Sequence, residues 1–142
     1  MDVDQRQVAL GIARARAING LFMLFLPGVA GKAFLGKDAS HPAVRAVLRL
    51  VGVRDLVLGV GAITTLKEGT MDAEFVGIGA VCDAVDGAVM LTMPGLGWRA
   101  KLTSLAGFSS AATGLMAARA IADARNAVDV AELEMEVLEV DS

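Results

Sequence analysis

The feature that most constrains this chain is a series of long apolar segments separated by short breakers. Residues 17–31 contain no charged residue over 15 positions, and residues 102–118 contain none over 17 positions. Segments of this length and polarity are typical of helices that are covered on most sides, by a protein core or by lipid. The Pro-Gly pairs and short polar links between them indicate where one helix stops and the next begins. The sequence therefore predicts an all-α protein.

Four helices are expected from the positions of these breakers. The first covers about residues 5–32, and Pro27 should kink or end it because proline lacks a backbone donor and clashes with the preceding turn. Ser40 is a suitable N-cap for the second helix. The short links favour an antiparallel, up-and-down four-helix bundle. The other three helices are expected at about residues 42–67, 71–93 and 98–125.

Composition favours a membrane over water as the surroundings of this bundle. Apolar residues make up 55% of the chain and charged residues 20%, and the mean hydropathy is +0.59. Soluble domains contain more charge, about 25%. Each expected helix has at least 22 residues, enough to cross a hydrocarbon layer of about 30 Å, although no uncharged run reaches the ~18 residues of a clear span. A soluble bundle that binds an apolar ligand remains the alternative.

The C-terminal residues differ from the rest in charge. Residues 123–142 carry seven acids and one base, a charge of −6, so that residues 1–122 carry +3 of the formal net charge of −3. We therefore divide the chain into a bundle, residues 1–122, and an acidic tail, residues 123–142. The alternation of Glu with apolar residues in the tail favours a strand, whereas its Glu-rich composition favours a helix or disorder. The tail is interpreted as mobile or as a contact for a partner.

Charged residues inside the second and third helices are the strongest candidates for a site. They are Arg49, Arg54 and Asp55, followed by Asp83 and Asp86. The two later aspartates are three positions apart and so share a helix face. Arg54 and Asp55 are adjacent, about 100° apart, so we expect that they do not neutralise each other. An unpaired charge at mid-bilayer costs roughly 2.5–3.5 kcal/mol, which predicts pairing across helices or a wet cavity.

The simplest pairing sets Arg54, or Arg49, against Asp83 and Asp86. Arg54 lies 13 residues before Lys67, and Asp83 lies 13 residues after Thr70. Both are therefore about 20 Å from the link between their helices at ~1.5 Å per residue. Three interpretations stay open: an ion-pair lock that fixes helix register, a polar pocket or proton-handling site, and a position at the membrane interface with shorter spans than those expected.

Glycines recur at helical spacing. Gly52 and Gly59 are seven residues apart, as are Gly107 and Gly114. Small residues at such intervals allow helix backbones to approach closely, as they do in membranes. Helix packing is the expected role of these four glycines, although a chain with 16 Gly also produces such spacings by chance.

Several function classes find no support. The chain is not basic enough to favour nucleic acid. One His and one Cys argue against a structural zinc site, and the single Cys82 excludes an internal disulfide. Neither a cofactor nor a metal is expected. No nucleophile–base spacing points to catalytic residues, so an enzyme is the least favoured class.

The stretch from Arg49 to Gly59, read as R-L-V-G-V-R-D-L-V-L-G, resembles a small family of bacterial four-span membrane proteins of unknown function, akin to the DoxX-like group. The pair Asp83 and Asp86, and a first helix ending in Pro-Gly, also recur in that group. The resemblance covers about residues 8–122 and leaves the acidic tail outside. It implies a four-helix membrane bundle and no known reaction.

The function expected from these observations is that of a small multi-pass protein of the cell membrane. It would serve as a binding or accessory module with a polar, ion-paired core, in contact with the lipid bilayer. The alternative is a structural subunit, in a homo-oligomer or a larger membrane complex. Lys and Arg near the helix ends number six on the side of the two termini and four on the other side, so both termini are expected in the cytoplasm.

Overall fold

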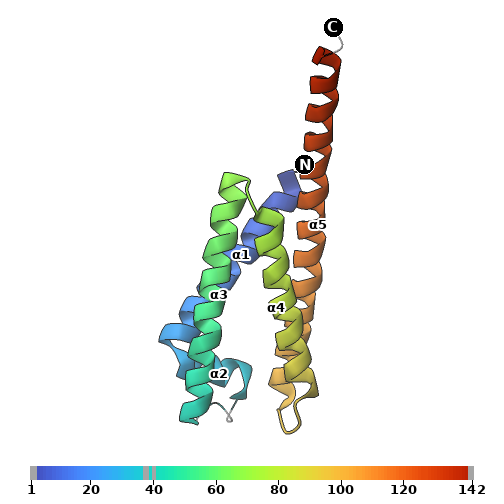
Figure 1. Ribbon diagram of the computed structural model, residues 1–142. Coiled ribbons are helices and arrows are strands. Elements are labelled where there is room, and N and C mark those ends of the chain that lie inside the picture. The colour runs from blue at the N-terminus through green and yellow to red at the C-terminus, as the bar shows by residue number, and fades with distance from the viewer. Residues whose placement is uncertain (1–2, 37–38, 40, 141–142) are drawn as a thin grey trace.

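Helices account for almost all of the described chain (Figure 1). The computed structural model of the protein describes residues 3–36, 39 and 41–140. No strand occurs in these ranges, which confirms the all-α prediction. The helices are α1 (Val3–Phe25), α2 (Pro27–Phe34), α3 (Pro42–Glu68), α4 (Asp72–Thr92) and α5 (Trp98–Val140).

The break expected at Pro27 is confirmed. α1 ends at Phe25, and Leu26 leaves the helical conformation with φ −122° and ψ 47°. Pro27 then takes the first position of α2, where the N–H that proline lacks would have had no helical partner. Of the two expected outcomes, a kink or an end, Pro27 produces an end, and residues 5–32 form two helices.

The ends of α3 follow local capping chemistry. The Nδ1 atom of His41 accepts a hydrogen bond from the backbone N–H of Ala43 at 3.2 Å, so His41 is the N-cap. The cap expected at Ser40 lies outside the described residues. At the other end, Gly69 has φ +74°, a left-handed conformation that glycine adopts without strain. Its N–H bonds to the carbonyl of Thr65 at 2.8 Å and ends the helix.

The helices form two closely packed antiparallel pairs, α1 with α3 and α4 with α5 (Figure 1). Contacts between the two pairs, through α3 with α4 and α1 with α5, are much sparser. The expected four-helix bundle therefore fits only loosely. α2 packs mainly on α3, near the turn that joins them.

Glycine explains why helices pair as they do. A Cβ added to Gly59 would lie 2.6 Å from the backbone nitrogen of Ala17, and one added to Gly52 would lie 2.8 Å from the carbonyl oxygen of Gly20. α1 and α3 thus touch backbone to backbone, which larger side chains would prevent. In the other pair, Gly107 and Gly114 of α5 face α4 in the same way, at 3.2 and 3.0 Å from α4 atoms.

Apolar side chains lie on the outside of the molecule. The buried core is mostly alanine, whereas Phe25 and Leu50 are each 71% exposed. The accessible surface is 8770 Å², against about 6,900 Å² for a compact soluble monomer of this mass. Three helices, α1, α4 and α5, are long and apolar enough to cross a membrane. The apolar character of these helices suggests a membrane protein.

The acidic tail continues α5 without a break. We expected the last helix to end near residue 125, but α5 runs to Val140 and projects beyond the other helices (Figure 1). The strand interpretation of its alternating pattern is therefore wrong. The sequence after Gly114 contains neither Gly nor Pro and is rich in Ala and Glu, which are strong helix formers. Residues 126–138 are all exposed, and we call residues 126–140 the α5 extension.

Candidate functional site

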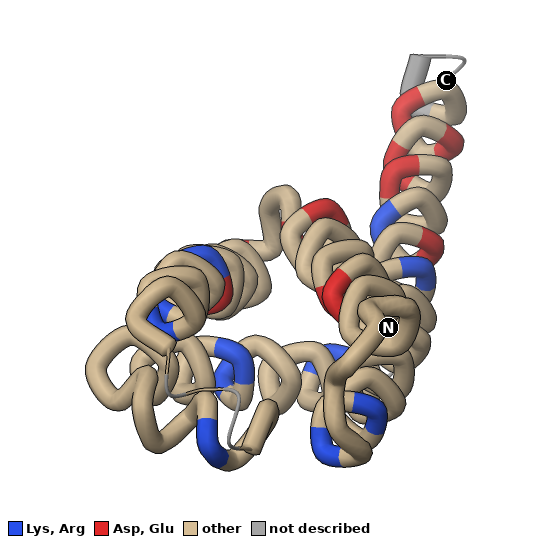
Figure 2. The backbone as a smooth tube through the Cα atoms, turned by 90° about the horizontal axis from the view of Figure 1, so that it is seen from below, with Lys and Arg blue, Asp and Glu red and all other residues tan. Residues whose placement is uncertain are grey.

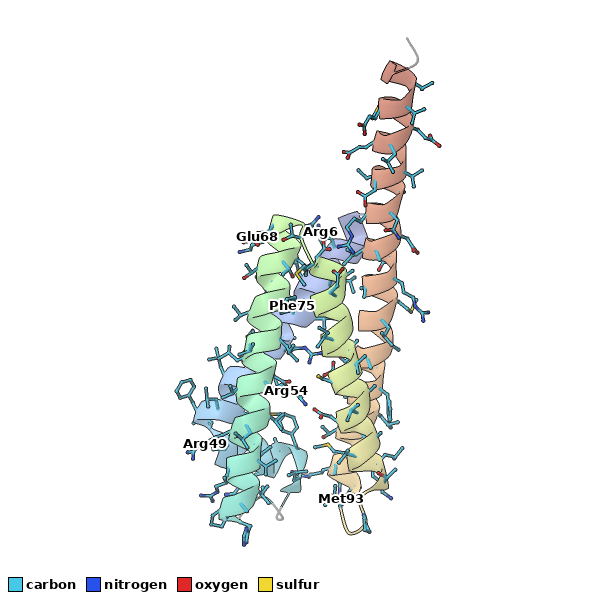
Figure 3. The ribbon with its side chains drawn as sticks, in the orientation of Figure 1. Arg6, Arg49, Arg54, Glu68, Phe75 and Met93 are labelled. Atoms are coloured by element: carbon cyan, nitrogen blue, oxygen red, sulfur yellow. The ribbon has the colours of Figure 1, made fainter. Side chains whose placement is uncertain are left out.

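Six polar side chains meet between the two helix pairs, near the middle of their helices. We call this group the polar layer. Figure 3 shows Arg54 pointing from α3 toward α4 at this level. The polar layer consists of Arg16 on α1, Arg54 and Asp55 on α3, Asp83 and Asp86 on α4, and Ser110 on α5.

Arg54 joins α3 to α4. Its Nη1 and Nη2 atoms donate to the two carboxylate oxygens of Asp86 at 3.0 and 2.6 Å. Such two-bond pairs are the strongest ion pairs that arginine makes. Nη2 also donates to Oδ1 of the adjacent Asp55 at 2.9 Å. The expectation that Arg54 and Asp55 cannot neutralise each other is therefore wrong, because the long arginine side chain folds back across the angle between them.

Asp83 pairs with Arg16 and not with Arg54. Nη2 of Arg16 donates to Oδ2 of Asp83 at 2.5 Å and to the carbonyl oxygen of Gly79 at 2.9 Å. The hydroxyl of Ser110 donates to the same carboxylate oxygen at 2.6 Å. Asp83 thus connects α1, α4 and α5.

The sequence interpretation missed Arg16. This residue directly precedes the uncharged run of residues 17–31. The available signal was its distance from Pro27, 11 residues or about three helical turns. That distance puts Arg16 well inside α1 and at a depth comparable to the aspartates of α4.

Burial within the polar layer is uneven. The side chains of Arg16 and Asp55 are each only 8% exposed, whereas that of Asp86 is 39% exposed. Arg49, which was also a candidate, is exposed and makes no ion pair with any described residue. Five residues correspond to about 140° of helix rotation, so Arg49 and Arg54 face different directions.

A second polar cluster ties the pairs together at the α3–α4 turn. The buried carboxylate of Asp72 lies 3.9 Å from Arg6 of α1 and 3.9 Å from Arg125 of α5. Arg125 also pairs with Glu74 at 2.8 Å, and Arg6 donates to the carbonyl oxygen of Leu66. The contact of Arg6 with Asp72 therefore bridges α1–α3 to α4–α5, whereas the contacts of Arg125 lie within the α4–α5 pair.

A small cavity lies beside the polar layer, toward the α3–α4 turn. Arg16, Ser110 and Phe75 line it together with apolar residues of all four long helices. Its volume is about 10 Å³, the space of about one water molecule. Within the described ranges, no group of three or more His, Cys, Asp or Glu could hold a metal ion.

Comparison of the chain with protein-family models, with curated proteins and with solved structures finds no match. The resemblance of the stretch from Arg49 to Gly59 to the DoxX-like group therefore stays a prediction.

Proposed function

We propose that this protein is an integral membrane protein whose polar layer locks the α1–α3 pair to the α4–α5 pair, and that it serves as an accessory module in the membrane. The observation that carries the proposal is the inverted polarity of the molecule. Asp55 is buried at 6% exposure while Phe25 and Leu50 are largely exposed. Lipid stabilises that arrangement, because exposing apolar side chains to water costs about 25 cal/mol of free energy for each Å² of apolar surface.

The pairing of charges inside the polar layer is also consistent with a membrane environment. Each unpaired charge in the hydrocarbon would cost roughly 2.5–3.5 kcal/mol, and Arg16 and Arg54 each meet a carboxylate directly. The sparse contacts between the helix pairs leave these ion pairs as the main specific connection at mid-depth. An ion-pair lock therefore suits the geometry.

The described cavity beside the polar layer is too small for a lipophilic ligand. A lipophilic ligand needs a pocket of ≈ 300 Å³ or more, and the described cavity has about 10 Å³. The second candidate function is a structural subunit of a membrane complex or homo-oligomer. The observation that favours it is the α5 extension, where Val128, Leu133, Met135 and Leu138 are exposed beyond the bundle.

Charge distribution bears on orientation in the membrane. In the structure, the end that carries α2 presents five described basic side chains, one more than the sequence count for that side, and no described acid: Lys32, Arg45, Arg49, Arg99 and Lys101. Figure 2 shows that acidic residues follow one another along the α5 extension, at the opposite end. The cytoplasmic leaflet is negative and attracts basic segments by about 1 kcal/mol per residue. We therefore propose the α2 end, and not the two termini, as the cytoplasmic side.

Membrane fractionation tests the proposal. The full chain should remain with the membrane pellet after an alkaline wash and enter solution only with detergent. A peripheral membrane protein expressed in the same cells, which the wash releases, is the control. Recovery of the chain in the soluble fraction would overturn the proposal.

A further inference from the structure

The polar layer contains one carboxylate more than it has cations. Arg16 pairs with Asp83 through 2.5 Å, and Arg54 pairs with Asp86 through two bonds. Asp55 is the third carboxylate, and it shares both arginines at 2.9 and 3.7 Å. With all three aspartates ionised, the polar layer has a net charge of −1.

An unpartnered donor lies next to this surplus carboxylate. Nη1 of Arg16 is buried and finds no hydrogen-bond acceptor in the described part of the chain. Its distance of 3.7 Å from Oδ1 of Asp55 is too long for a hydrogen bond. A buried donor normally finds a protein or water partner. The cavity that Arg16 lines has room for about one water molecule.

Building on the proposed function, we propose that the polar layer binds one proton, carried by Asp55. With Asp55 neutral, one cation remains for each of the two ionised carboxylates, Asp83 and Asp86. A water molecule in the cavity that Arg16 lines accepts the free N–H of Arg16. Oδ1 of Asp55 continues to accept from Arg54. The proton comes from solvent, turns the carboxylate into a carboxyl group, and changes the net charge of the polar layer from −1 to zero.

The net charge of the polar layer is set by the groups around Asp55. Arg16 approaches it from α1, and Arg54 lies on α3 itself. Asp83 and Asp86 approach from α4, and α5 contributes the neutral hydroxyl of Ser110. A proton fits this place better than a metal ion, because the described residues offer no three-ligand group. A net charge in a low-dielectric interior is expensive, and binding a proton removes it.

Infrared spectroscopy of the full-length protein in lipid nanodiscs tests the inference. The wild-type protein at neutral pH should show the C=O stretch of one protonated carboxyl group per chain. This band should disappear in Asp55→Asn and persist in the control Glu74→Gln, which removes an exposed carboxylate outside the polar layer. Asp55→Glu should shift the band, which identifies its source even if Asp55→Asn does not fold.

Two results would overturn the inference. One is the absence of the band from the wild-type protein, and the other is a band that neither Asp55 variant changes. Either result, in a chain that remains with the membrane after the alkaline wash, leaves the proposed membrane function intact. Recovery of the chain in the soluble fraction would overturn the proposed membrane function, whatever the infrared result.

Discussion

Arg54 of α3 and Asp86 of α4 are joined by two parallel hydrogen bonds of 3.0 and 2.6 Å. They belong to different helix pairs, and the backbones of those pairs make few contacts with each other. Side chains therefore provide the connection that close backbone packing provides within each pair.

Removing Arg54 should destabilise the protein strongly. Arg54→Ala leaves Asp86, whose side chain is 39% exposed, without its partner, and an unpaired charge in the hydrocarbon costs roughly 2.5–3.5 kcal/mol of stability. Replacing Arg54 and Asp86 together by apolar residues should restore much of the loss. Arg49→Ala on the same helix is the matched control and should have little effect, since Arg49 is exposed. Denaturant unfolding in detergent compares the wild type, the single variants at Arg54 and Asp86, the double variant and Arg49→Ala. A loss of stability in the double variant equal to the sum of the two single losses would contradict the pair.

Two arginines of α1 provide a similar comparison. Arg16→Met strands the carboxylate of Asp83 and should lower the melting temperature by several degrees, whereas Arg14→Met removes an exposed charge and should not. Thermal melts in the same detergent compare the two variants. Equal changes in melting temperature for the two substitutions would mean that the contact of Arg16 with Asp83 does not contribute to stability.

Gly59 should tolerate no side chain. The added Cβ of Gly59→Ala would lie 2.6 Å from the backbone of Ala17, so α1 and α3 must separate and the protein should lose stability. Gly11→Ala is the control, because its Cβ would meet nothing within 4 Å. That change should stabilise α1 by up to about 1 kcal/mol, the helix propensity difference between Gly and Ala. Similar unfolding curves for both variants would argue against close packing at Gly59.

The α5 extension should contribute little to the stability of the bundle. Residues 126–138 are exposed, so truncation after Arg125 removes few contacts and should leave the melting temperature nearly unchanged. Truncation after Ala118 is the contrasting variant, since it removes Ile121, which is 2% exposed, and Arg125 with its ion pairs. A large drop in melting temperature after truncation at Arg125 would mean that the extension packs on a second copy or a partner.

Labelling of single cysteines tests the proposed orientation in the membrane. In a Cys82→Ala background, Ala43→Cys marks the α2 end and Ala131→Cys marks the α5 extension; both positions are exposed. A maleimide that cannot cross membranes should label the variant at position 131 in intact cells and the variant at position 43 only after lysis. The opposite pattern would support cytoplasmic termini, the orientation expected from the Lys and Arg count.

The sequence by itself determined the helices and most of their ends. Pro27 ended α1 because its backbone chemistry does not depend on distant residues. The absence of Gly and Pro after Gly114 was equally local, and it should have predicted that α5 continues through residue 125. The alternation of Glu with apolar residues in the α5 extension did not predict its structure, because a period of two indicates a strand only where a sheet buries one face.

Only the tertiary structure decided which helices pair and which charges meet. Helix periodicity placed Asp83 and Asp86 on one face, but it could not show that Arg16 of α1 reaches the first and Arg54 of α3 the second. Which arginine pairs with which aspartate depends on how far each helix is rotated and shifted against its neighbours. Close glycine contacts between α1 and α3 fix that shift, and they bring together residues that are far apart along the chain.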